Sequence, residues 1–89
     1  MLRIEFTIEP FIEGRPGPHV MSAVEAVRAF GIDVEFGPFG SLCTVPAAQV
    51  GDVSNAIVAA AFANGATHLN LDITLVDGSA GTDTPGAPA

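Results

Sequence analysis

Strict alternation of polar and apolar residues is the feature that most limits how this chain can fold. Residues 3–9 alternate without interruption, with Ile4, Phe6 and Ile8 at the apolar positions. Successive side chains of a β-strand point to opposite faces, so the pattern predicts a strand with one face in the core. The same alternation over residues 67–76 predicts a last strand. Its inward residues are Leu69, Leu71, Ile73 and Leu75.

Between these strands the apolar residues take on helical spacing. Residues 19–30 place them three and four apart, and Gly31 follows as the expected C-terminal stop. Residues 47–63 are rich in alanine and predict a second helix, which Asn64-Gly65 closes.

Two further strands are predicted between the helices, over residues 32–36 and 41–45, with a hairpin turn at 37–40. The order is strand, helix, strand, strand, helix, strand. It predicts an α+β fold, a ferredoxin-like βαββαβ plait with an antiparallel four-stranded sheet and two helices on one face. The first and last strands are expected at its centre. The domain covers residues 1–76, and residues 77–89 are expected to form a disordered tail.

The charge balance limits the partners. The 89 residues include ten acidic residues, three arginines and no lysine, which gives a formal net charge of -7. Nucleic acid and anionic membranes both require basic patches, so neither is an expected partner. A charged ligand is expected to be a cation, although solubility alone also explains an acidic surface. The sequence shows no signal peptide and no membrane-spanning stretch, and it has a single cysteine, so we expect a cytoplasmic protein.

The outward side chains of the strands include several carboxylates. Glu5, Glu9 and Asp72 are expected to be neighbours on the face that no helix covers. Three interpretations are open: a solvated face, an oligomer interface, or a pocket for a cationic small molecule at such an interface.

Few residues suggest catalysis or metal binding. His19 and His68 have no ligand partner close in sequence and are expected at the surface, and Cys43 is expected to be a small buried residue. No catalytic and no metal site is predicted. Two phenylalanines, Phe11 and Phe39, lie in proline-containing loops and either stack on a flat ring or cap the core. These loops are expected at opposite ends of neighbouring strands.

Several segments together resemble the small thiamine-binding protein family. They are Ile4 to Phe11, Gly14 to Val20, Gly31, and Gly37 to Ser41. The resemblance implies a ferredoxin-like unit that assembles into a homo-oligomer, dimer or tetramer, and binds thiamine through its pyrimidine moiety without catalysis.

Carried over by position, the family's proline at the exit of strand one is Pro10, and its glycine-containing loop is Gly14 to Gly17. Its Pro-Met-Gly-Thr turn corresponds to Pro38-Phe39-Gly40-Ser41. Two departures stand out. Pro18 or His19 replaces a small hydroxyl residue at the entry to helix one, and Thr44-Val45 replaces Glu-Gly after the turn.

The resemblance therefore implies a non-catalytic protein that binds thiamine or its hydroxymethylpyrimidine at a homo-oligomer interface, with no other cofactor. The expected contacts are Glu9, Phe11, Phe39, Ser41 and Thr44. The alternatives are an oligomeric interaction or regulatory module without a ligand, and a small plait enzyme with His19 or His68 as base.

Overall fold

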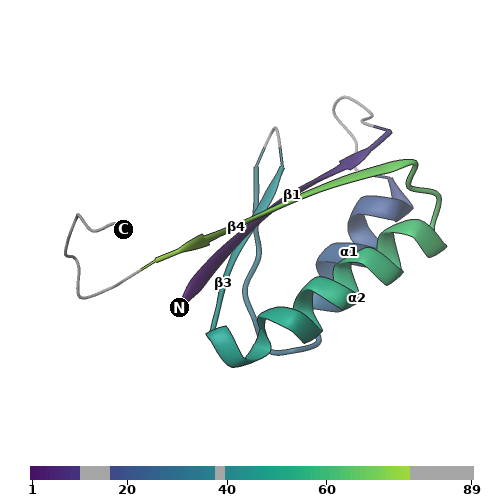
Figure 1. Cartoon of the computed structure of the whole chain (residues 1–89). Coiled ribbons are helices and arrows are strands. Elements are labelled where there is room, and N and C mark those ends of the chain that lie inside the picture. Colours follow the sequence, from purple (N-terminus) through teal and green to yellow (C-terminus); the bar gives the residue numbers. More distant parts are fainter. Residues whose placement is uncertain (11–16, 38–39, 77–89) are drawn as a thin grey trace.

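A computed structural model describes residues 1–10, 17–37 and 40–76 (Figure 1). Four antiparallel strands form one sheet in the order β2-β3-β1-β4. Both helices lie on the same side of this sheet, as Figure 1 shows. The predicted ferredoxin-like α+β class is confirmed. The predicted tail at residues 77–89 lies outside the described residues.

The elements follow the predicted order with some different bounds. They are β1 (Leu2–Glu9), α1 (Pro18–Arg28), β2 (Glu35–Phe36), β3 (Ser41–Val45), α2 (Val50–Ala63) and β4 (His68–Leu75), with a short 3₁₀ turn, η1 (Ala47–Gln49), before α2. Gly31 has a φ of 79°, the left-handed conformation that ends a helix without a Cβ clash. The main difference is β2, which pairs with β3 over two residues instead of five.

The core lies between the sheet and the helices. Ile4, Phe6 and Ile8 of β1 are buried there, as the alternation predicted. Helix α1 contributes Ala23, Val24 and Val27, helix α2 contributes Val53, Ile57 and Ala61, and β3 contributes Cys43 and Val45. The predicted burial of Cys43 is confirmed, and burial raises the pKa of its thiol.

The position of β4 corrects one prediction. The central strands are β1 and β3, whereas β4 forms an edge of the sheet. The predicted inward residues of β4 do lie on the helix side, because they are in register with the helix-side residues of β1. However, Ile73 is 44% exposed and Leu75 is 72% exposed, since α2 makes few contacts with β4.

Within residues 1–10, 17–37 and 40–76, no strand pairs with the outer edge of β4. The Val76 amide donates to the Met1 carbonyl at 3.0 Å, which makes this pair a hydrogen-bonded one. Hydrogen-bonded pairs alternate along an antiparallel ladder, so the even-numbered residues of β4 bond to β1. The peptide groups that point to the free edge are those of Leu69, Leu71, Ile73 and Leu75.

Candidate functional site

The open face of the sheet carries the charged residues that the alternation predicted. Glu5 lies directly opposite Asp72 of β4 and Leu42 of β3, and Leu42 lies opposite Glu35 of β2. This places three carboxylates in one row across the sheet. Like charges in directly opposite cross-strand positions repel, and Glu5 and Asp72 are such a pair. The predicted proximity of Glu5 and Asp72 is confirmed. Glu9 lies four residues further along β1, opposite His68, and is not their neighbour.

Three of the five predicted contact residues, Glu9, Ser41 and Thr44, lie in the described part of the chain, and they do not come together within one chain. Glu9 ends β1, whereas Thr44 lies opposite Arg3, six residues earlier on β1. At about 3.4 Å per residue this separates them by roughly 20 Å. Ser41 is opposite Phe6, so it belongs to the helix side, and it is buried. Phe11 and Phe39 lie outside the described residues.

The two predicted loops leave the sheet at the same end, not at opposite ends. Ser41 pairs with Phe6, and β3 runs antiparallel to β1, so the hairpin turn lies beside the C-terminal half of β1. Gly40 approaches β1 so closely that a Cβ there would lie 3.1 Å from the Thr7 hydroxyl oxygen.

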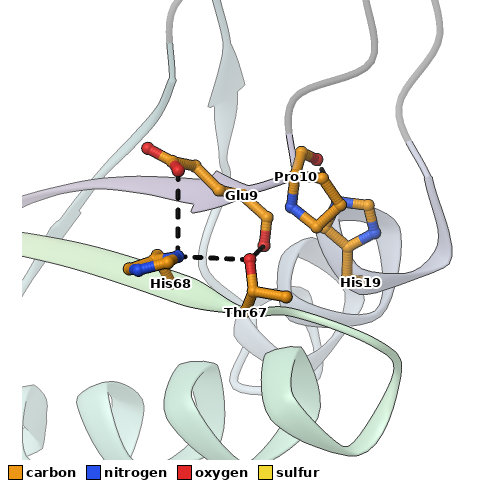
Figure 2. A network of polar contacts seen from close by, with 5 residues as sticks. All are labelled: Glu9, Pro10, His19, Thr67 and His68. Carbon is orange, nitrogen blue, oxygen red and sulfur yellow. Dashed lines mark hydrogen bonds and ion pairs between the residues drawn. The ribbon is translucent and has the colours of Figure 1, made fainter.

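A polar network surrounds the end of β1 (Figure 2). The Thr67 amide and hydroxyl both donate to the Glu9 carbonyl, at 2.8 and 3.3 Å. The Nδ1 atom of His68 lies 3.2 Å from that hydroxyl and 3.9 Å from Oε1 of Glu9. The side chains of His68 and Glu9 are 73% and 50% exposed, so their ion pair adds little to stability.

His19 is buried, which corrects its predicted surface position. Only 4% of it is exposed, and its Nε2 atom lies 2.6 Å from the Pro10 carbonyl (Figure 2). A carbonyl only accepts hydrogen bonds, so Nε2 carries the proton. The ring also packs on Gly17, where a Cβ would lie 2.5 Å from its Cε1 atom. His19 therefore joins the start of α1 to the end of β1. His68 is exposed, as predicted.

Two open hollows lie on either side of the Glu35–Leu42 pair, which lines both. The first, the hairpin hollow, has a volume of about 380 Å³ and includes Glu5, Thr7, Phe36 and Ser41 in its lining. The second, the edge hollow, has a volume of about 480 Å³ and includes Phe30, Asp33 and Thr44. Both volumes are in the range of small-ligand pockets, about 300–1,000 Å³.

The residues that line the hollows differ in part from the contact residues predicted from the sequence. Ser41 and Thr44 were predicted and line different hollows, whereas Glu5, Glu35 and Phe36 were not proposed as contacts. The alternation did predict that Glu5 points outward, and the pairing of Glu35 with Leu42 places Glu35 on the same face. Their convergence depends on the register between β1, β3 and β2, which a single strand's pattern does not specify.

Within residues 1–10, 17–37 and 40–76, no group of three or more His, Cys, Asp or Glu side chains has the arrangement of a metal site. In the same part of the chain, no helix is both long and apolar enough to cross a membrane.

Comparison with solved structures finds the same fold in proteins of low sequence identity. A domain of unknown function, DUF77, from Bacillus cereus aligns with a TM-score of 0.62 and 20% identity over 92% of this chain and 81% of that chain. A hypothetical protein from Methanocaldococcus jannaschii aligns with a TM-score of 0.60 and 15% identity, over 93% of this chain and 86% of that chain. A protein from Streptococcus pneumoniae aligns with a TM-score of 0.58 and 12% identity, over 89% of this chain and 90% of that chain.

No family model matches the sequence, and no curated protein matches it. At these identities the structural matches establish the fold alone. The class that fold and surface define is a small ferredoxin-like α+β domain with an acidic open sheet face.

Proposed function

We propose that this protein is a non-catalytic binding protein for thiamine or its pyrimidine moiety, and that it acts as a homo-oligomer. The observation that carries the proposal is the pair of hollows that share Glu35. Thiamine combines a positively charged thiazolium with a flat aminopyrimidine. An acidic, ligand-sized surface next to hydroxyl and aromatic residues suits both parts, and the family resemblance of the sequence points to the same ligand.

Isothermal calorimetry with thiamine and with hydroxymethylpyrimidine tests the proposal. We expect saturable heat with at least one of them. Glu35→Gln should weaken thiamine binding about three- to tenfold, because it removes a carboxylate from both hollows. Glu25→Gln is the matched control, since Glu25 is an exposed residue of α1 and lines neither hollow. Absence of heat and of a thermal shift with both compounds at millimolar concentration would contradict the proposal.

The free edge of β4 supports the homo-oligomeric part of the proposal. Exposed strand edges pair readily with other chains, and the exposed apolar side chains of Ile73 and Leu75 flank this one. The remaining exposed apolar residues on the neighbouring helix α2 are Val58 and Phe62. A second copy of the chain, paired antiparallel along β4, would cover these groups.

Charge repulsion disfavours one register of that pairing, and we propose the register centred on Leu71. A two-fold axis at Leu71 places Leu69 opposite Ile73 and Asn70 opposite Asp72, whereas an axis at Asp72 would oppose two carboxylates. We expect Asn70→Cys and Asp72→Cys chains to cross-link when mixed and Asp72→Cys alone not to do so. Light scattering should show an oligomer that Ile73→Lys dissociates. A monomeric wild-type protein would contradict the oligomer.

An oligomer that binds neither compound would instead support the ligand-free interaction module, which the β4 edge alone favours. The enzyme alternative gains no support from the histidines. The Nε2 proton of His19 is donated to the Pro10 carbonyl inside the protein, and His68 lies on an exposed strand end.

A further inference from the structure

The edge hollow exists because β2 is short. The Gly37 amide donates to the Gly40 carbonyl at 2.8 Å, which makes these two residues a hydrogen-bonded pair at the turn. Alternation along the ladder makes Glu35 and Leu42 the next such pair, with Thr44 due to form the third. However, β2 begins at Glu35, so no strand residue lies in register opposite Thr44. The peptide N–H and C=O of Thr44 therefore lie in the plane of the sheet and point sideways into this gap, away from β1.

Only one residue of β3, Thr44, has both of its peptide groups available for hydrogen bonds in this gap. The peptide groups of Leu42 already face Glu35, and Pro46 has no N–H. An additional β-strand would gain only one hydrogen-bonded pair here, which is too little for strand addition. A small planar ring needs no more than this, because a ring nitrogen can accept from the Thr44 N–H while a neighbouring amino group donates to the Thr44 C=O.

The walls of the edge hollow suit the rest of such a ligand. Asp33 and Glu35 are exposed carboxylates and line the hollow together with Thr44. Phe30 is partly exposed and lines it as well, which provides an aromatic surface for a flat ring. Neither of the described arginines, Arg3 and Arg28, is part of this lining. The lining therefore favours a ring that carries, or is attached to, a positive charge.

We propose that the peptide edge of Thr44 is the recognition element for the aminopyrimidine ring, with the cationic part of the ligand near Asp33 and Glu35. The inference rests on the proposed function for the class of ligand. It adds the position of the ring, and it assigns recognition to the backbone of Thr44 and not to its hydroxyl. This recognition does not require the carboxylate that the related family has at the position of Thr44.

Amide chemical shifts measured by NMR during titration with hydroxymethylpyrimidine test the placement. We expect the Thr44 amide to shift with saturation, and Gly37 and Gly40 to move little. Thr44→Pro removes the N–H while sparing the ladder to β1, because the Thr44 peptide groups do not face β1. It should weaken hydroxymethylpyrimidine binding about tenfold. Thr44→Val, which keeps the backbone and loses only the hydroxyl, should bind like the wild type.

Two carboxylate variants complete the design and do not depend on the proline variant folding. Asp33→Asn, which alters the edge hollow alone, should weaken thiamine binding about threefold, whereas Glu5→Gln, which alters the hairpin hollow alone, should not. Binding that shifts Gly37 and Gly40 and is lost in Glu5→Gln would overturn the placement and leave the proposed function intact. Absence of any binding would overturn both.

Discussion

The strands β1 and β4 have the same length and the same alternation, yet only one of them is buried. They pair along their full length, and their apolar residues point to the same side. Ile4 and Ile73 are direct partners in this register, with exposed fractions of 0% and 44%. The difference follows from position, because β1 has a strand on each side and β4 has one. Alternation specifies the face of a side chain, whereas its burial depends on what covers that face.

Truncating the two partner isoleucines measures this difference most directly. Ile4→Ala should lower the free energy of unfolding by about 2–5 kcal/mol, because it leaves a cavity in the middle of the core. Ile73→Ala should lower the free energy of unfolding of a monomer by about 1 kcal/mol, because the Ile73 side chain is already partly exposed to solvent. Urea unfolding at low protein concentration provides both values.

The same pair also reports on assembly. If β4 pairs with a second copy, the cost of Ile73→Ala should rise with protein concentration, while the cost of Ile4→Ala should not. Equal costs for the two substitutions in a proven monomer would refute the contrast between centre and edge.

The two histidines extend the comparison to the strand ends. His19 is buried and donates a hydrogen bond to the Pro10 carbonyl just after β1, whereas His68 is the first residue of β4 and is exposed to solvent. His19→Ala should lower the free energy of unfolding by about 1–3 kcal/mol, because the Pro10 carbonyl loses its partner. His68→Ala should change it by less than about 0.5 kcal/mol. Thermal unfolding of both variants at one pH measures the difference, and a larger loss for His68→Ala would be inconsistent with this structure.

The smallest effect is expected on the covered side, in helix α2. The Ser54 hydroxyl is buried and has no hydrogen-bond partner among the described residues. Ser54→Ala removes this group and introduces a better helix former, so it should raise stability by about 0.5–1 kcal/mol. Asn55→Ala, at an exposed position of the same helix, serves as the control for helix propensity alone. A stabilisation no greater than that of the control would mean that the Ser54 hydroxyl carries no penalty.

Much of the fold could be predicted because its signals are local. The spacing around Val24 and Ile57 reflects the helical period, and Gly31 follows α1 in the left-handed conformation, although the helix ends at Arg28, two residues before the predicted end. The candidate site could be predicted only in part. Ser41 and Thr44 line hollows, but Glu5 and Glu35 meet across Leu42 only through strand pairing. The Thr44 peptide group faces a gap because β2 begins only at Glu35, which the predicted strand over residues 32–36 did not indicate.

The sequence by itself determined the order of the elements, the inward face of each strand and the acidity of the open face, since these depend on neighbouring residues along the chain. Only the tertiary structure decided that β4 lies at an edge, that His19 is buried, and that two hollows share Glu35. Each of these depends on contacts between residues far apart in the chain. Such contacts are set by how strands pair and where helices pack, which local periodicity does not encode.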